Sequence, residues 1–265
     1  CIRDSTGGDG QGTFNISTAA AIVASAAGVP VAKHGNRSVS SRSGSADVLE
    51  ALGVPIEVDP NRAAEVLDQI GISFLFAPRL HPAMRQVMPV RHALGVRTIF
   101  NILGPLSNPA GARRQVLGVY EDRLVPLLAE VLRELGCDHA MVVRGSDGLD
   151  ELTTTAPSLV AEVRGSSIEE YRVAPHELGL DQASPEDLLG GDPQHNAELM
   201  LRIFEGREGP LLDITVLNAG AAIYVGGRCS RLVDGVEVAR QAILSGAAGE
   251  KLAELRQSHS GSADG

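Results

Sequence analysis

The sequence has 265 residues, of which 43% are hydrophobic and 21% charged, which is enough apolar material for one large core or for a core with a small subdomain. Its formal net charge of −10 argues against nucleic-acid binding as the main role, and the 3% aromatic content leaves few side chains for stacking on bases. No apolar run of about 18 residues occurs and the first residues do not form a basic segment followed by an apolar one, so we expect a soluble, cytoplasmic protein without membrane contact.

A glycine-rich turn at residues 6–13 precedes a helix that we expect to begin near Ser17 or Thr18 and to end before Gly28. Glycines without a Cβ let backbone N–H groups approach an anion closely, and the first turn of a helix adds unpaired N–H donors and a positive dipole end. The turn therefore suits a phosphate or pyrophosphate group. A tight turn with a capped helix, without any ligand, is the alternative.

A second donor-rich loop follows the short apolar strand expected at Val29–Ala32 and precedes the helix expected at Ala46–Leu52. Lys33, Arg37 and Arg42 are interleaved with serines in this loop, and an anion can use such donors whereas a packed core cannot. The alternative is a solvated charged loop. Two loops of this kind, each ending a strand or opening a helix, are typical of ligand binding at the carboxyl edge of an α/β sheet.

The following segments predict a helix at Pro60–Gly71 and a buried strand at Ile72–Ala77. Another helix is expected from His81, because Pro82 occupies an early helical position. His81 itself is more typical of a loop histidine than of a catalyst. Residues 98–109 are rich in Gly, Pro and Asn and are interpreted as the connection back to the sheet.

An acidic loop, Arg144–Glu151, follows the strand expected at Ala140–Val143. Carboxylate oxygens at the carboxyl end of a strand suit Mg²⁺ bound to a diphosphate, since this ion takes few protein ligands and keeps several waters. Asp150 and Glu151 are therefore candidate metal ligands. An exposed acidic turn is the alternative.

The C-terminal half predicts an antiparallel hairpin at the sheet edge, because residues 158–173 alternate around Gly165. Residues 175–193 are interpreted as an irregular polar connection, and residues 258–265 as a flexible tail. Asp213–Val225 is apolar all round and is expected to be a buried helix. The remaining expected elements are a strand at Gln115–Tyr120 and helices at Asp122–Leu135, Asn196–Phe204, Gly235–Ser245 and Ala247–Gln257.

Several well-known chemical motifs are missing from the sequence. It contains no Gly-x-x-x-x-Gly-Lys-Ser/Thr, Gly-x-Gly-x-x-Gly, His-Glu-x-x-His or Gly-x-Ser-x-Gly pattern, so nucleotide hydrolysis, dinucleotide redox chemistry, zinc proteolysis and serine hydrolysis lack their usual residues. Cys1, Cys137 and Cys229 have no Cys-x-x-Cys spacing, which argues against a disulfide framework or a cysteine zinc site.

The same loops carry a family resemblance. The blocks are Thr6-Gly-Gly-Asp-Gly10, Asn15-Ile-Ser-Thr18, the long segment Lys33–Gly53, His81-Pro-Ala-Met84, Asn101–Pro109 and Asp147-Gly-Leu-Asp-Glu151. They resemble the anthranilate phosphoribosyltransferases of tryptophan biosynthesis, and the long segment is the most specific. The resemblance implies an α/β fold with a central mixed, mostly parallel sheet flanked by helices, as in nucleoside phosphorylases and phosphoribosyltransferases. Residues 81–108 would belong to a small helical domain.

The resemblance implies transfer of the phosphoribosyl group of 5-phosphoribosyl 1-pyrophosphate (PRPP) to the amine of anthranilate, with Mg²⁺ as cofactor and no covalent nucleophile. The implied residues, carried over by position, are Gly8, Asp9, Thr13, Asn15, Ile16, Ser17, Thr18, Lys33, His34, Gly35, Asn36, Arg37, Ser38, Val39, Ser40, Ser41 and Ser45 for the donor, Ser5, Asn36 and Arg91 for the acceptor, and Ser17, Asp150 and Glu151 for the metal.

The start of the chain departs from the family pattern. The family has a helical segment and a buried strand before the glycine-rich turn, whereas this chain reaches the turn after only Cys1–Ser5. We therefore expect a fragment that lacks the N-terminal part of the small helical domain. Ser5 also stands where the family has glycine, at a position associated with both substrates. At full length the resemblance implies a homodimer.

Two other functions remain as alternatives. A pyrimidine nucleoside phosphorylase has the same fold, but its loop resembles Lys-x-x-Gly-Arg-Gly, which the order Lys33-His-Gly-Asn-Arg-Ser38 does not fit. A noncatalytic relative that binds nucleic acid is the second alternative, and the acidic net charge disfavours it.

Overall fold

The computed structural model of the chain describes residues 1–6, 10–38, 42–80 and 99–259. One sheet in this part of the chain has the strand order β1-β4-β5-β6-β7, in which β1, β4 and β5 are parallel and β6 and β7 are antiparallel. Two further strands, β2 and β3, form a parallel pair. The strands are β1 (Ile2–Ser5), β2 (Val31–Gly35), β3 (Ile72–Phe76), β4 (Arg114–Gly118), β5 (His139–Gly145), β6 (Ser158–Arg164) and β7 (Ser167–Val173).

The two strand groups meet at β1 and β2. The Ala32 N–H donates to the Cys1 carbonyl at 3.1 Å, and the His34 ring lies 3.9 Å from the Asp4 carboxylate three residues further along β1. Because both strands advance in the same sense between these two contacts, β2 runs parallel to β1. The arrangement is the mixed, mostly parallel α/β sheet that the sequence predicted.

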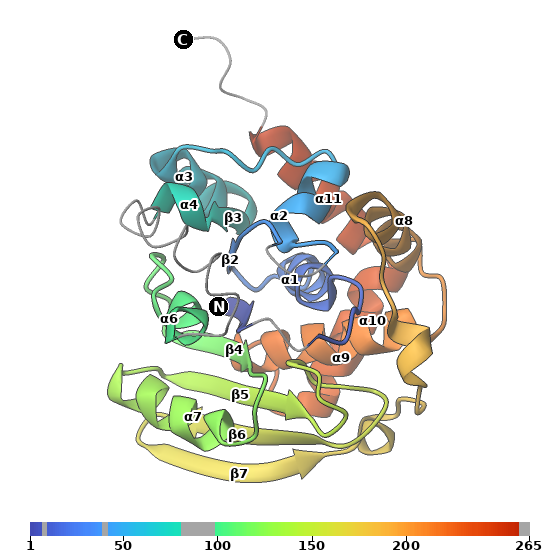
Figure 1. Ribbon diagram of the computed structural model, residues 1–265. Coiled ribbons are helices and arrows are strands. Elements are labelled where there is room, and N and C mark those ends of the chain that lie inside the picture. The colour runs from blue at the N-terminus through green and yellow to red at the C-terminus, as the bar shows by residue number, and fades with distance from the viewer. Residues whose placement is uncertain (7–9, 39–41, 81–98, 260–265) are drawn as a thin grey trace.

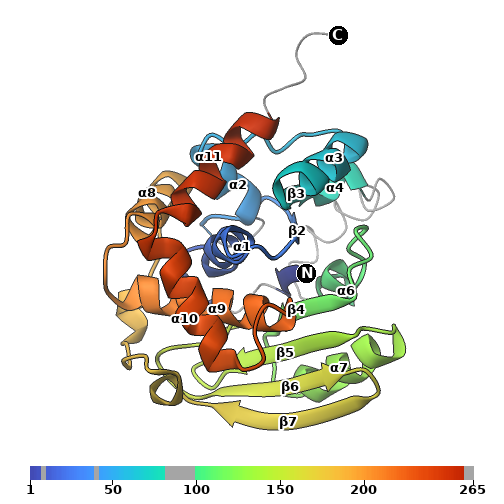
Figure 2. The ribbon, with the colours of Figure 1, turned by 180° about the vertical axis from the view of Figure 1, so that it is seen from behind.

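Helices flank this sheet (Figures 1 and 2). The helix α7 packs on β5 and β6, whereas α9 covers β4 and β5 from the opposite face. The helices are α1 (Ile16–Ala26), α2 (Ser45–Ala51), α3 (Pro60–Ile70), α4 (Ala77–Leu80), α6 (Ile99–Leu106), α7 (Leu124–Glu134), α8 (Pro193–Phe204), α9 (Pro210–Val225), α10 (Leu232–Leu244) and α11 (Ala247–His259), with short 3₁₀ helices η1 (Pro175–Leu178) and η2 (Pro185–Leu188). No helix among the described residues is long and apolar enough to cross a membrane.

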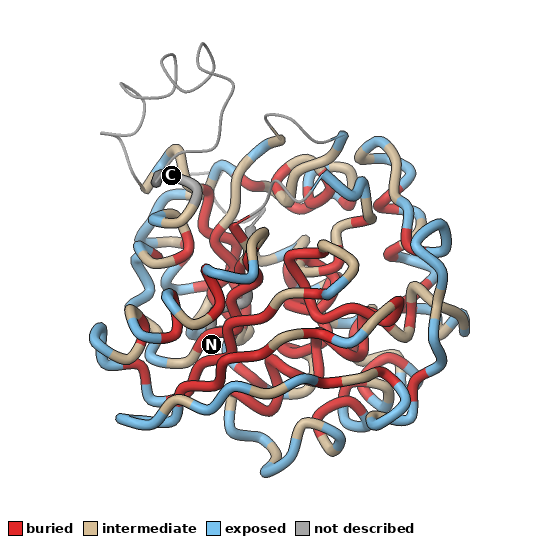
Figure 3. Tube along the Cα trace, turned by 60° about the horizontal axis from the view of Figure 1, so that its bottom comes forward, coloured by how far each residue is buried: buried red, intermediate tan, exposed pale blue. Residues whose placement is uncertain are grey.

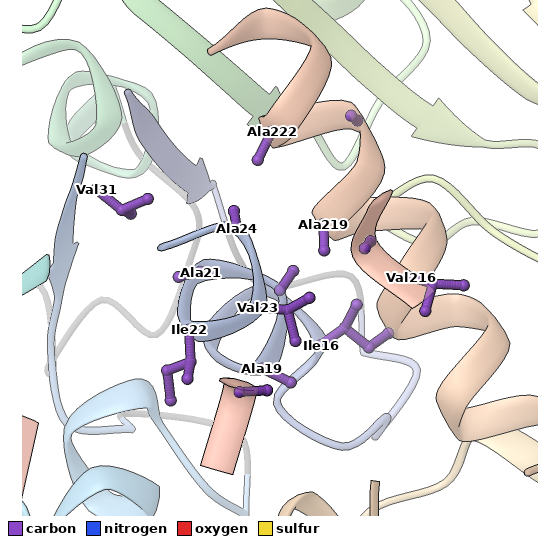
Figure 4. Close-up of a cluster of buried hydrophobic side chains, with 14 of the residues drawn as sticks. Ile16, Ala19, Ala21, Ile22, Val23, Ala24, Val31, Val216, Ala219 and Ala222 are labelled. Atoms are coloured by element: carbon purple, nitrogen blue, oxygen red, sulfur yellow. The ribbon is translucent and has the colours of Figure 1, made fainter. Parts of the chain in front are cut away.

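The larger hydrophobic core is centred on α1. Ala19, Ala21 and Ala24 are buried, and Ile16 and Val23 of α1 point toward Val216 and Ala219 of α9 (Figure 4). The helix α9 is buried along almost its whole length, as its uniformly apolar sequence predicted. Figure 3 shows that burial is concentrated along the strands and these inner helices. Packing in this core therefore fixes the position of α1, and the N-terminus of α1 belongs to the predicted site.

A second core lies under α7. Successive residues of a strand face opposite sides, so Met141 and Val143 of β5 join the larger core while Val142 joins Leu128 and Leu132 of α7. The hairpin β6–β7 turns at Gly165, whose φ of 57° is a left-handed conformation that glycine tolerates, and β7 is mostly exposed at the sheet edge. The predicted edge hairpin is confirmed.

Several elements differ from the sequence-based expectations. Residues 2–5 form a strand in the sheet, and α6 occupies residues that were interpreted as a connection. The strand β2 extends to Gly35, so Lys33 and His34 lie within the strand and not in the loop after it. The segment 175–193 contains η1 and η2, and α11 continues two residues into the expected tail. Residues 81–98, where a helix was expected, lie outside the described residues.

Candidate functional site

The predicted site lies at one edge of the sheet. Because β1, β4 and β5 are parallel neighbours, their carboxyl ends at Ser5, Gly118 and Gly145 share this edge. The glycine-rich turn follows β1, the β2–α2 loop follows β2, and the acidic loop follows β5. The three predicted segments therefore begin at adjacent strand ends.

Specific contacts join the three segments. Lys33 Nζ of β2 donates to Ser17 Oγ in the first turn of α1 at 3.2 Å. Asn15 Nδ2 donates to the carbonyl of Ser43 in the β2–α2 loop at 3.2 Å. Gln11 Nε2, at the end of the glycine-rich turn, contacts the carbonyl of Asp147 in the acidic loop at 3.4 Å. The segments that the sequence analysis singled out thus meet at the same place in the fold.

The N-terminus of α1 presents donors at this place. Asn15 is the N-cap residue, yet its side chain makes no cap hydrogen bond, and its carbonyl accepts from Thr18 and Ala19 at 3.1 Å. Within the described residues the Ser17 N–H has no backbone acceptor. Lys33 is only 5% exposed, and its ammonium lies beside this helix N-terminus through the contact with Ser17. The arrangement is suited to an anion such as a phosphate.

The β2–α2 loop is held by Asp47 of α2. One of its carboxylate oxygens accepts from the N–H groups of Ser38 and Gly44, each at 2.9 Å. A Cβ at Gly44 would lie 2.4 Å from the Ser38 nitrogen, so glycine is required for the loop to close this tightly. Ser45 Oγ contacts the Asn36 carbonyl at 3.4 Å on the same loop. Within the described residues, these contacts hold the two ends of the loop together at the start of α2.

Arg37 forms ion pairs with two acidic residues of α2. Its guanidinium bonds both oxygens of Glu50, one of them at 2.7 Å, and contacts Asp47 at 3.3 Å. The hydrogen bonds that Arg37 donates to the Glu50 carboxylate raise the pKa of Arg37 above its ordinary value. Of the three predicted cationic residues, Lys33 contacts the α1 N-terminus whereas Arg37 pairs with α2.

The acidic loop is ordered by a residue that the sequence analysis did not select. The Asp147 carboxylate accepts from the Leu149 N–H at 3.0 Å, from Thr153 Oγ1 at 2.6 Å and from the Thr155 hydroxyl. This network folds the loop so that Asp150 and Glu151 are 6% and 5% exposed. The alternative of an exposed acidic turn is therefore wrong.

Gly118 brings the acidic loop against β4. A Cβ at Gly118 would lie 1.6 Å from the Asp150 carbonyl oxygen and 3.3 Å from the Ser5 Cβ. The predicted metal ligand Asp150 and the predicted acceptor residue Ser5 are thus neighbours across the glycine. Any larger residue at this position would displace the acidic loop.

The donor set fits a Mg²⁺ ion that is shared with a diphosphate. Two buried carboxylates, Asp150 and Glu151, follow β5, and the hydroxyl of Ser17 lies at the α1 N-terminus. Among the described residues no group of three or more His, Cys, Asp or Glu residues is arranged to hold a metal ion by itself. Mg²⁺ commonly takes one or two carboxylates, with the remaining positions filled by phosphate oxygens and water.

The structure does not place every predicted residue. Gly8, Asp9, Val39, Ser40, Ser41 and Arg91 lie outside the described residues. Ile16 and Thr18 are 2% exposed, and Thr13 forms an isolated β-bridge with Leu189, so the structure packs all three around the start of α1.

A clamp formed by residues 188–191 was missed by the sequence analysis. The Phe14 N–H donates to the Leu188 carbonyl at 3.1 Å, and the Gly190 N–H donates to the Gly12 carbonyl at 2.9 Å. A Cβ at Gly190 would lie 2.7 Å from the Phe14 nitrogen. The adjacent glycines followed by Asp192 and Pro193, a helix-start pattern, were the available signal.

Comparison with known proteins defines the class. Residues 3–249 match the family model described as glycosyl transferase family, a/b domain. The chain is therefore a member of this glycosyltransferase family, and its mostly parallel α/β sheet agrees with the a/b domain of that description.

The family can be specified further. The chain is 55% identical to the anthranilate phosphoribosyltransferase of Parvibaculum lavamentivorans, over 94% of this chain and 73% of that protein, and 54% identical to that of Acetivibrio thermocellus, over 94% and 72%. The Thermus thermophilus enzyme superposes with a TM-score of 0.92 at 48% identity, covering 98% of this chain and 77% of that one. The Saccharomyces cerevisiae enzyme in complex with PRPP and Mg superposes with a TM-score of 0.89 at 29% identity, covering 98% and 74%. The chain belongs to the anthranilate phosphoribosyltransferase family.

Proposed function

We propose that this chain transfers the phosphoribosyl group of PRPP to the amine of anthranilate, which gives N-(5-phosphoribosyl)anthranilate and pyrophosphate in tryptophan biosynthesis. The observation that carries the proposal is the convergence of Lys33, the α1 N-terminus and the acidic loop at one sheet edge, in a chain of this family. Family membership decides against the pyrimidine nucleoside phosphorylase alternative.

The residues act by binding and orientation. Bond breaking at the ribose C1 leaves positive charge on the sugar and negative charge on the departing diphosphate. The open Ser17 N–H and the Lys33 ammonium can stabilise the diphosphate, and preorganised donors of this kind need no rearrangement during the reaction. Holding the two substrates in contact lowers the entropic part of the barrier, and no covalent nucleophile is needed.

Asp150, Glu151 and Ser17 are the proposed Mg²⁺ ligands. When it is bound, Mg²⁺ neutralises charge on the diphosphate. The chain itself holds these two carboxylates in place in two ways. The hydrogen bonds of Asp147 order the acidic loop, and the Asp150 carbonyl packs directly against Gly118 of β4.

The acceptor side is proposed from the resemblance, with Ser5, Asn36 and Arg91 facing anthranilate. Ser5 lies at the end of β1 beside Gly118 and the Asp150 carbonyl, so a group bound there would be next to the proposed metal ligands. Its hydroxymethyl group occupies space that the family's glycine leaves open. Arg91 would pair its guanidinium with the anthranilate carboxylate.

We also infer a cytoplasmic homodimer whose partners are small molecules and not nucleic acids. The family assignment supports the dimer, and the net charge of −10 disfavours a nucleic-acid partner. Light scattering tests the dimer, because the protomer has a mass of 27.7 kDa and a dimer twice that value.

The test of function is a fluorescence assay that follows anthranilate consumption in the presence of PRPP and Mg²⁺. We expect consumption that requires both PRPP and Mg²⁺ and that stops on addition of a chelator. The assay is run on this chain and on a chain extended at its N-terminus to the length of the curated relatives. Constant anthranilate fluorescence with both chains would overturn the proposal.

A further inference from the structure

We propose that Asn196 of α8, which no motif of the sequence singles out, is a positioning residue that fixes the orientation of the Asn15 side-chain amide in the donor site. The inference rests on the proposed function, because it takes Asn15 to be a contact of the phosphoribosyl donor. Asn196 and Asn15 are separated by 181 positions in the chain, and α8 packs against α2, the helix that follows the β2–α2 loop.

The Asn15 amide has a defined orientation. Its Oδ1 accepts two hydrogen bonds, from Asn196 Nδ2 at 2.9 Å and from Ser43 Oγ at 3.1 Å. Its Nδ2 donates one hydrogen to the Ser43 carbonyl at 3.2 Å. Reversing the amide would place oxygen against the Ser43 carbonyl and nitrogen against the Asn196 nitrogen, so both neighbours oppose the reversal.

The orientation matters because the expected ligand is an anion. An asparagine amide has two N–H donors on one side and only acceptor lone pairs on the other. Asn15 uses one of its N–H groups on Ser43, and among the described residues the second has no acceptor, so it can donate to a ligand. In the reversed orientation Asn15 would present an oxygen to the diphosphate, which repels it. The Asn15 side chain makes no cap hydrogen bond to α1, so within the described part of the chain its hydrogen-bond partners are Ser43 and Asn196.

Asn196 is itself fixed. It is 1% exposed, and its Oδ1 accepts the Gly191 N–H at 2.7 Å, which leaves its Nδ2 as the only group that can face Asn15. A Cβ at Gly190 would lie 2.7 Å from the same Oδ1, so the clamp of residues 188–191 closes directly on the Asn196 amide. The orientation is therefore transmitted from the clamp through Asn196 to Asn15.

The test is a double-mutant cycle on PRPP binding, measured by calorimetry with Mg²⁺ and without anthranilate. We expect Asn196→Ala to raise the Kd for PRPP about five- to ten-fold in the wild-type chain, the size of one well-placed hydrogen bond. In the Asn15→Ala background the same substitution should change the Kd by less than about two-fold, because the residue through which Asn196 acts is then missing.

The double-mutant cycle needs a matched control on α8 and a second variant at Asn196. Gln194→Ala on the exposed side of α8 should leave the Kd unchanged. If Asn196→Ala fails to fold, Asn196→Asp replaces it, because the aspartate still accepts the Gly191 N–H but cannot donate to Asn15. The repulsion between its charge and PRPP is present in both backgrounds and cancels in the cycle.

Steady-state kinetics supply a second readout. A positioning role predicts a raised KM for PRPP with an unchanged KM for anthranilate, whereas general loosening of the fold would raise both. Equal changes of the Kd in the two backgrounds, or no change in either, would overturn the inference. A chain that binds PRPP without consuming anthranilate would refute the proposed function and leave this cycle measurable, and a chain that does not bind PRPP refutes both.

Discussion

Lys33 Nζ lies 3.2 Å from Ser17 Oγ, and this contact joins the second strand of the chain to the first turn of α1. The lysine is buried within a strand, so its stem packs in the core while its ammonium reaches the sheet edge. A bound diphosphate would bring negative charge next to this ammonium. Lys33 is therefore placed to bind a phosphate group of the donor.

We expect Lys33→Met to weaken the binding of PRPP. The variant keeps the unbranched stem and removes the charge, so PRPP should bind at least about ten-fold more weakly because a charge-assisted hydrogen bond is lost. A thermal melt checks that the variant is folded, so that weaker binding is not a loss of structure. Calorimetry with PRPP measures the Kd.

Lys251→Met is the matched control, because Lys251 of α11 contacts Glu254 and the Ile70 carbonyl, away from the site. Its Kd for PRPP should equal that of the wild type. Unchanged PRPP binding in Lys33→Met would remove Lys33 from the donor site.

Much of the fold was predictable because its signals are local. The buried helix α9, the edge hairpin around Gly165 and the helix after Pro60 follow from the spacing of apolar residues within short windows. The loops around Ser17, Lys33 and Asp150 were recognised because small and polar residues cluster at predicted strand and helix ends.

The remaining features depend on contacts that no local window contains. The strand β1 is four residues long and exists through its ladder with β4, more than a hundred positions away. The clamp of residues 188–191 pairs with Phe14, which lies in the other half of the chain. The proposed role of Asn196 depends on its hydrogen bond to Asn15, which is 181 positions away. Asp147 was overlooked because its role is to accept hydrogen bonds inside the loop.

The two carboxylates after β5 give a direct test of the metal proposal. We expect the combined substitutions Asp150→Asn and Glu151→Gln to abolish Mg²⁺-dependent anthranilate consumption, because amide groups are poor ligands for Mg²⁺ compared with carboxylates. The fold should be retained, since both changes nearly preserve side-chain volume, and circular dichroism checks this.

The pair Glu169→Gln and Glu170→Gln on the exposed edge strand β7 is the control, because it removes the same charge away from the site. Consumption should persist in this variant. If the double variant at Asp150 and Glu151 keeps wild-type turnover, these residues are not the metal ligands.

Gly118 offers a test of geometry that leaves every polar group in place. In Gly118→Ala the new methyl group would meet the Asp150 carbonyl oxygen at 1.6 Å, so the acidic loop must move. We expect turnover to fall at least about a hundred-fold, because a small displacement of the reacting groups lowers the reaction rate strongly. Gly249→Ala on α11 is the control, since no atom lies within 4 Å of the added methyl group, and a helix gains about 1 kcal/mol from the change. Wild-type turnover in Gly118→Ala would show that the position of the loop is unimportant.

The last prediction concerns a buried carboxylate far from the site. Glu162 of β6 is 6% exposed and accepts hydrogen bonds from His139 at 2.8 Å, Tyr171 at 2.6 Å and Tyr224 at 2.8 Å, with Arg164 at 2.7 Å. Burial alone raises the pKa of Glu162, but the bonds from His139, Tyr171 and Arg164 outweigh it and lower the pKa to about 2.

Because the folded-state pKa lies below the unfolded value, ionised Glu162 stabilises the fold above about pH 4.3, and this stabilisation is lost as the pH falls toward about 2. We expect Glu162→Gln to lower the free energy of unfolding by about 2 to 4 kcal/mol at pH 7 and to flatten its dependence on pH between these limits. Urea unfolding at pH 7 and pH 3 measures both effects. Glu169→Gln, an exposed neighbour on β7, should behave as the wild type at both pH values. An acid-stability profile that is the same for Glu162→Gln and the wild type would show that the ionised carboxylate does not stabilise this part of the sheet.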